Sequence, residues 1–205
     1  ESLVRKLPAF SRFLEVAALS NAKMINYTEV ARDAQIAPSV CYEYFQILKD
    51  TLIAHELPCW QETKKRKALT TGKYFFFDCG VMRVLQHRSP FQINDPLYGE
   101  ALESYIFHEL TTFTDYFRLA PLHYWRSTSQ FEVDFIFNNQ IAIEIKSTKN
   151  PGTSNLKGLL ALREESLLRR YILVCNVPRA RRENGIEVYP IEEFLKLLWT
   201  GALTS

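Results

Sequence analysis

The stretch that decides the fold is Phe131-Glu-Val-Asp-Phe-Ile-Phe137, followed by Asn138-Asn-Gln140 and Ile141-Ala-Ile-Glu-Ile-Lys-Ser147. Apolar and polar residues alternate in both flanks, which is the period-2 pattern of β-strands. The polar residues between the flanks suit a turn, so the stretch predicts one β-hairpin. The alternation places Glu132 and Asp134 on one face of the first strand, and Glu144 and Lys146 on one face of the second. A loop of residues 138–140 sets Asp134 across from Glu144 and Glu132 across from Lys146.

Charged residues on one strand face have an ordinary interpretation as well as a functional one. Such a face is commonly the solvated side of an antiparallel sheet. Two carboxylates that face each other repel, however, and a divalent cation turns that repulsion into a binding site. The second strand is also very apolar, which indicates a sheet covered on both sides. We therefore predict that Asp134 and Glu144 hold Mg²⁺ or Mn²⁺ and that the Lys146 ammonium orients a water.

This arrangement resembles the active-site hairpin of the PD-(D/E)XK nuclease superfamily. The resemblance implies that Asp134 and Glu144 bind the metal with the Ile145 carbonyl, and that Lys146 assists the attacking water. It also implies a further acidic residue on the helix that precedes the hairpin.

The segment 98–110 has the apolar spacing of an amphipathic helix and supplies that acidic residue. Its Gly99 and Glu103 resemble the G-x-x-x-E start found in archaeal Holliday-junction resolvases. We therefore expect Glu103 to complete the catalytic set and the metal site. Glu100 and Glu109 are weaker candidates with an ordinary interpretation as solvated helix charges.

A wider resemblance joins several motifs along the chain: Gly99-Glu-Ala-Leu-Glu103, His108-Glu-Leu110, Tyr124-Trp-Arg126, Glu132-Val-Asp-Phe135 and Ile143-Glu-Ile-Lys-Ser147. Together they resemble the C-terminal region of a family of prokaryotic AAA-type ATPases. In that family a P-loop domain comes first, a winged helix follows, and a nuclease-like domain of unassigned function comes last. No G-x-x-x-x-G-K-[ST] motif occurs here, so we expect no ATP site in this chain. We therefore expect either a fragment of a longer protein or a relative that lacks the ATPase. A start at Glu1 instead of Met favours the fragment, whose partner would be the ATPase domain of the parent chain.

Residues 1–90 read as a winged helix-turn-helix domain. Apolar residues at 10, 13, 14, 17 and 18 share one helical face, and two short helices over 29–34 and 39–48 follow. A hairpin whose second strand is Phe75-Phe-Phe77 completes the layout. The polar, Pro-containing segment 86–95 is the predicted junction to a second domain over 91–205.

DNA contacts in this chain have two candidate sources. On the third helix Gln46 is the chief side chain suited to base edges, because no Arg or Lys precedes Lys49. The basic run of Lys64, Lys65, Arg66 and Lys67 and a group of C-terminal arginines suit phosphates; these are Arg163, Arg169, Arg170, Arg179, Arg181 and Arg182. Short basic runs are also common in solvated loops, and a winged helix that contacts protein stays open beside one that reads DNA.

The remaining sequence predicts an α/β domain. A helix from Ser154 to about Leu168, a buried strand over 171–175, a strand over 185–190 and a last helix over 191–199 surround the hairpin. We predict an α+β chain overall: a winged helix followed by a restriction-endonuclease-like mixed sheet between helices.

Composition fits a cytoplasmic globular protein. The 205 residues are 47% hydrophobic with a net charge of +2, and they hold no long apolar run and no secretory leader, so we expect no membrane partner. The scattered cysteines lack C-x-x-C spacing and are expected to be buried, reduced thiols. The oligomeric state stays open.

Two functional classes follow from these observations. The first is a Mg²⁺-dependent DNA phosphodiesterase that uses Asp134, Glu144, Lys146 and Glu103. The second is a non-catalytic module that binds DNA or protein and gives specificity to an ATPase domain. Fold resemblance does not choose between them, because function belongs to the site.

Overall fold

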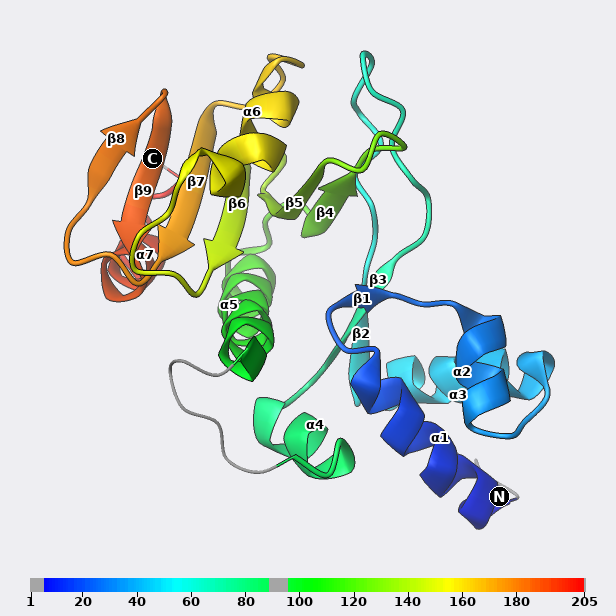
Figure 1. Ribbon diagram of the computed structural model, residues 1–205. Coiled ribbons are helices and arrows are strands. Elements are labelled where there is room, and N and C mark those ends of the chain that lie inside the picture. Colours follow the sequence, from blue (N-terminus) through cyan, green and yellow to red (C-terminus); the bar gives the residue numbers. More distant parts are fainter. Residues whose placement is uncertain (1–5, 89–95, 205) are drawn as a thin grey trace. The chain divides into compact units, whose positions relative to one another are not determined.

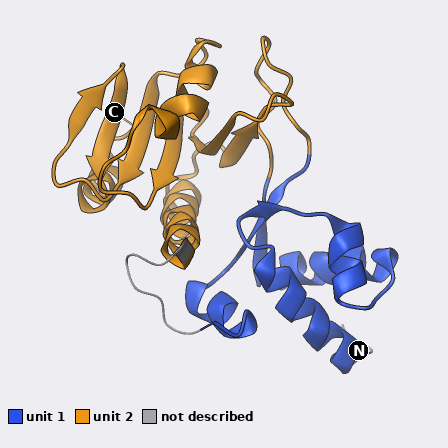
Figure 2. Cartoon of the chain, viewed as in Figure 1, with its two compact units in different colours: residues 1–57, 71–91 blue, residues 58–70, 92–205 orange. Residues whose placement is uncertain are grey.

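The structure is a computed structural model that describes residues 6–88 and 96–204. The chain divides into two compact units, residues 1–57 with 71–91 and residues 58–70 with 92–205 (Figure 2). The segment 58–70 therefore belongs to the second unit, although it connects two strands of the first. The predicted boundary between residues 90 and 91 lies outside the described residues.

The first unit consists of helices and a small antiparallel sheet. Its described elements are α1 (Leu7–Leu19), β1 (Lys23–Met24), α2 (Tyr27–Asp33), α3 (Pro38–Asp50), β2 (Ala54–Leu57), β3 (Lys73–Phe76) and α4 (Cys79–Leu85). The strands run in the order β1-β3-β2. Asn26 caps α2 by accepting from the backbone N–H groups of Thr28 and Glu29, at 3.2 and 3.3 Å. Pro38 stands in the first turn of α3, where its missing N–H costs nothing.

The core of the first unit confirms the predicted helical faces. Phe13, Ala17 and Ala18 of α1 are buried, as are Tyr44 and Leu48 of α3. Phe10, Leu14, Val40 and Ile47 are partly buried against the same core. The apolar spacing at residues 10, 13, 14, 17 and 18 thus identified which side of α1 faces inward.

The second unit is built on one mixed sheet. Its described elements are α5 (Pro96–Phe117), β4 (His123–Arg126), β5 (Glu132–Phe137), β6 (Ile141–Lys146), the 3₁₀ turn η1 (Thr153–Leu156), α6 (Lys157–Arg163), β7 (Arg170–Cys175), β8 (Arg181–Glu183), β9 (Ile186–Pro190) and α7 (Ile191–Trp199). The strand order is β4-β5-β6-β7-β9-β8 (Figure 1). The strands β6, β7 and β9 are parallel, and the other neighbours are antiparallel.

The hairpin at the centre of the sequence argument is confirmed. Phe137 pairs with Ile141, so the loop is residues 138–140 as expected. Asn138 and Asn139 adopt φ of 50° and 51°, a left-handed conformation that asparagine tolerates better than most residues. The sheet is covered on both faces, with α6 on one side and α5 and α7 on the other (Figure 1). This explains why β6 is buried along nearly its whole length.

The prediction of one helix from Ser154 to about Leu168 is wrong. This stretch consists of the 3₁₀ turn η1 and the short helix α6, which ends at Arg163. Ser166 adopts a φ of 57°, which no α-helix continues through. None of the described helices combines the length and the apolar character that a membrane crossing requires.

Candidate metal centre

The strands β5 and β6 part at the point where the predicted carboxylates lie. Their pairing extends from Phe137–Ile141 to Phe135–Ile143. Beyond it, the Asp134 carboxylate replaces the missing ladder bond, because its Oδ2 accepts from the backbone N–H of Ile145 at 2.8 Å. Asp134 and Glu144 are each only 7% exposed. The parting of the strands thus leaves two buried carboxylates beside each other.

Glu144 lies between an opposite charge and a like charge. Its Oε1 is 2.5 Å from Nζ of Lys146, whereas its Oε2 is buried and has no hydrogen-bond partner. Burial and then the nearby Asp134 raise the pKa of Glu144 to about 8. Burial by itself would lower the pKa of Lys146, but Asp134 and Glu144 raise it above its ordinary value. Lys146 therefore stays protonated and is the local counter-ion of the pair.

Glu103 approaches this pair from α5. It is half-buried and close enough that its charge contributes to the raised pKa of both Glu144 and Lys146, as the weakest of the causes acting on each. Within residues 6–88 and 96–204, no group of three or more His, Cys, Asp and Glu side chains could hold a metal ion. Of the weaker candidates, Glu109 accepts from Nε1 of Trp199 at 2.6 Å, and Glu100 is half-buried near the start of α5. The geometry thus offers Asp134 and Glu144 as the close carboxylates.

Glu132 does not form the expected register pair with Lys146. The ladder between β5 and β6 ends before it reaches Glu132, which pairs with Arg126 on β4, and its Oε2 accepts from Nη1 of Arg126 at 2.8 Å. The carboxylate that precedes Asp134 by two residues is therefore part of an ion pair between neighbouring strands.

Sequence reasoning missed Asn176, which follows β7 directly. Its Nδ2 donates to the carbonyl of Ser147 at 2.9 Å, and its backbone N–H donates to the carbonyl of Thr148 at 3.0 Å. The hydroxyl of Tyr98 donates to its Oδ1 at 3.5 Å. Asn176 thereby connects the end of β6, which carries Lys146, to the start of α5, which carries Glu103. An amide side chain immediately after a buried strand was the available signal.

The basic run 64–67 is fixed within the second unit. The Glu165 carboxylate accepts from the successive backbone N–H groups of Lys64, Lys65 and Arg66, each at 2.9 Å. Burial by itself would raise the pKa of Glu165, but these donors hold it below its ordinary value. The side chains of Lys64, Lys65 and Lys67 remain exposed.

Arg66 anchors the same segment through its side chain. Its guanidinium donates to the carbonyl of Ala161 at 3.0 Å, pairs with Glu164 at 2.6 Å, and lies over the ring of Phe131 at 5.3 Å. Main-chain bonds add to the attachment, from Trp60 N–H to the Tyr124 carbonyl and from Leu69 N–H to the Arg126 carbonyl. The segment 58–70 thus covers β4, which is an edge strand of the sheet.

The outward side of α3 presents few groups for base recognition. Tyr42 and Glu43 are exposed, Gln46 is half-buried, and Lys49 pairs with Glu56 at 2.5 Å. Lys49, the basic residue of α3, is therefore already paired with a carboxylate.

Three of the four cysteines match the prediction of buried, reduced thiols. Cys41, Cys59 and Cys175 are buried, Cys79 is partly buried, and all are free thiols. Burial raises the pKa of Cys41 to about 11, so this thiol is inert at neutral pH.

Two stretches of the chain match family models. Residues 1–92 match a domain of unknown function (DUF8612), and residues 98–194 match a domain of unknown function (DUF4143). The second domain occurs C-terminal to AAA ATPases in some proteins.

Curated proteins similar to this chain include the uncharacterized protein Rv2008c of Mycobacterium tuberculosis and the uncharacterized protein Mb2031c of Mycobacterium bovis. Each is 25% identical over 142 residues, which cover 65% of this chain and 31% of the relative. The chain therefore spans less than a third of the length of these relatives. No solved structure matches the chain.

Proposed function

We propose that the second unit is a PD-(D/E)XK nuclease-like domain that hydrolyses phosphodiester bonds of DNA with a divalent cation. The observation that carries this proposal is the pair of buried carboxylates, Asp134 and Glu144, with the Lys146 ammonium beside them. Without a cation, the buried Oε2 of Glu144 has no partner. Such a group is costly to bury, and a buried, unpartnered carboxylate oxygen is typical of functional sites.

The residues present fit a hard divalent cation. Mg²⁺ is usually held by one or two protein carboxylates and otherwise by waters and substrate phosphates, so two carboxylates suffice. Asp134 and Glu144 would hold it, with the Ile145 carbonyl and Glu103 as the additional groups that the family resemblance suggests. When bound, the ion would supply charge stabilisation at the phosphate and a more acidic water.

The residues of the chain have separate tasks around that site. The Ile145 N–H fixes the orientation of Asp134. Lys146 compensates the charge of Glu144, and its partly exposed ammonium is placed to orient a water or to stabilise charge on a phosphate oxygen. Asn176 acts indirectly, as a positioning residue, because it attaches the loop after β6 to the start of α5.

We further propose that the first unit is a winged helix-turn-helix and that the parent chain carries an AAA-type ATPase domain. The helices α1 to α3, followed by the strands β2 and β3, support the first statement. The DUF4143 match and the greater length of the relatives support the second. The pairing of Lys49 with Glu56 and the exposed Tyr42 and Glu43 favour a protein contact over base reading for α3.

A second candidate function is a non-catalytic binding module. Two observations favour it: Lys146 already pairs with Glu144 at 2.5 Å, and the described residues form no group of three His, Cys, Asp or Glu side chains that could hold a metal ion. Such a site would be a relic in which an internal ion pair has replaced the metal.

Cleavage assays separate the two candidates. Linear, branched and single-stranded DNA are incubated with the full chain and Mn²⁺. We expect cleavage that falls at least about 100-fold in Asp134→Asn and in Lys146→Met, since each removes a group that acts on the transition state. Glu132→Gln is the matched control, because this carboxylate lies on the same strand but pairs with Arg126. No cleavage of any substrate, or equal cleavage by Asp134→Asn, would favour the binding module.

A further inference from the structure

Arg181 lies on the same face of the sheet as the candidate metal centre. It pairs with Val188 on β9, Val188 pairs with Leu173 on β7, and Leu173 pairs with Glu144 on β6. Directly paired residues point to the same side of a sheet. Arg181 and Glu144 therefore share a face, three strands apart, which corresponds to about 14 Å between their backbones.

Arg181 is at the level of Leu173 in β7, two residues before Cys175, the last residue of that strand. Its charge also opposes part of the rise that burial causes in the pKa of the Cys175 thiol. Cys175 is the register partner of Lys146 on the neighbouring strand. Lys146 and Arg181 are therefore two cationic residues on the same face of the sheet, on either side of β7.

Arg181 is available for a ligand. Its side chain is 39% exposed, and its bonds to Glu183 are long, at 3.4 Å. An exposed ion pair of this kind contributes only about 0–1 kcal/mol. A phosphate, which accepts two guanidinium N–H groups at once, competes well for such an arginine.

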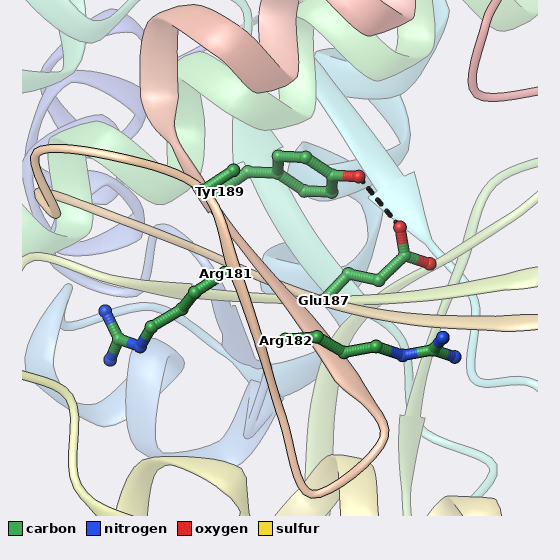
Figure 3. A pocket seen from close by; sticks show the side chains of 5 residues that line it. Arg181, Arg182, Glu187 and Tyr189 are labelled. Carbon is green, nitrogen blue, oxygen red and sulfur yellow. Dashed lines mark hydrogen bonds between the residues drawn. The ribbon is translucent and has the colours of Figure 1, made fainter.

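The next residue, Arg182, is in a different environment. Figure 3 shows Arg181 and Arg182 leaving β8 in opposite directions. Arg182 pairs in register with Glu187, on the face away from Glu144, and both arginines line the rim of a surface depression of about 400 Å³. The Glu187 carboxylate there already accepts from Arg170 at 3.0 and 2.8 Å and from the Tyr189 hydroxyl at 2.8 Å. Two adjacent arginines of equal charge are therefore assigned to opposite sides of the sheet.

We propose that Arg181 binds a phosphate of the DNA strand near the one cleaved, so that the strand runs along the carboxyl ends of β6 and β7. This inference rests on the proposed function. One DNA strand carries a phosphate per ~3.4 Å of helix axis, so the phosphate at Arg181 lies roughly two to four nucleotides from the cleaved one. The side is fixed by the register of the sheet, which places Arg181 with Lys146 and excludes Arg182.

The test is DNA binding by the full chain without divalent metal. Fluorescence anisotropy of a labelled duplex is measured in EDTA over a series of NaCl concentrations. Loss of one phosphate contact is expected to reduce the slope of log K against log salt by about 1 in Arg181→Ala, with weaker binding at every salt concentration. Arg182→Ala, the matched control, is expected to keep the slope and the affinity of the unchanged protein. Arg181→Lys, which retains the charge, is expected to restore the slope.

Three outcomes would overturn the assignment: no change in Arg181→Ala, an equal loss in Arg182→Ala, or no binding of DNA by the unchanged protein. Thermal melting of each variant shows that it is folded, and the exposure of both arginines makes the substitutions tolerable. Because EDTA removes metal, the result is independent of catalysis. Metal binding by Asp134 can therefore succeed where this inference fails, and the reverse also holds.

Discussion

Two buried carboxylates of the second unit show opposite behaviour, and the difference separates structure from function at the scale of single residues. Glu165 is surrounded by donors, since three successive backbone N–H groups point at it, and its pKa is lowered. Glu144 has one unpartnered oxygen and a carboxylate neighbour, and its pKa is raised. A satisfied carboxylate stabilises the fold, whereas an unsatisfied one beside a like charge is a candidate for ligand binding.

Glu165→Gln tests the structural half of this contrast. An amide presents an NH₂ group to N–H donors, so we expect the free energy of unfolding to fall by about 1–3 kcal/mol at pH 7. A lowered folded-state pKa contributes stability above the unfolded value of about 4.3, and that stability is lost as the pH falls through the folded pKa. The difference between the two proteins should therefore shrink below pH ~4. Urea denaturation at both pH values measures it.

Glu164→Gln is the control for that experiment. The Glu164 side chain is 60% exposed and forms an ion pair with Arg66, so its loss should cost no more than about 1 kcal/mol. An equal effect of the two substitutions would show that the three backbone hydrogen bonds to Glu165 add no more stability than an exposed ion pair.

At the scale of elements, the contact between α6 and β5 supports one side of the candidate site. Gly158 stands in the first turn of α6, and a Cβ there would lie 1.8 Å from the Glu132 carbonyl oxygen. This backbone atom belongs to the strand that carries Asp134. The helix can approach the strand this closely only with glycine at that position.

Gly158→Ala should therefore destabilise the protein, although alanine is the better helix former. Backbone must move to admit the methyl group, at a cost of about 1–3 kcal/mol that outweighs the ~1 kcal/mol gained in helix propensity. Thermal unfolding measures the sum. Gly152→Ala is the control, because nothing lies within 4 Å of the Cβ it would add. If Gly158→Ala stabilised the protein, α6 could not lie as close to β5 as described.

Local sequence patterns predicted the elements whose backbone hydrogen bonds are made within a short stretch of sequence. The hairpin over 132–146 was recognisable because both strands alternate and the loop consists of polar residues. The register beyond Phe135 was not, since the Asp134 side chain takes the place of a ladder bond. The edge strand β8, Arg181–Glu183, was also missed, because three charged residues carry no apolar period.

The fate of the basic run 64–67 depended on residues far away in sequence. Nothing near Lys64 indicates that its backbone N–H meets the carboxylate of Glu165, about a hundred residues later. Phosphate binding by this run stays a prediction, and the structure adds that its backbone is fixed by the Glu165 carboxylate while its three lysine side chains remain exposed. Long-range satisfaction of this kind lies outside what local sequence patterns can predict.

At the scale of the whole molecule, the second unit includes a segment that lies, in the sequence, between the strands β2 and β3 of the first unit. Residues 58–70 cover the edge strand β4 and supply the donors for Glu165 (Figure 2). A fragment that starts at residue 92 would lack both. Experiments on the candidate site therefore require the full chain, with the segment in place.

The central claim is that Asp134 and Glu144 together bind a divalent cation, and Mn²⁺ binding to the full chain tests it most directly. Isothermal titration should show about one Mn²⁺ per chain, and Mn²⁺ at 100 times its Kd should add about 2.7 kcal/mol of stability in thermal melts. Asp134→Asn keeps an acceptor for the Ile145 N–H, so it should fold but lose both the heat of binding and the stabilisation. Absence of binding by the unchanged protein, or undiminished binding by Asp134→Asn, would contradict the account.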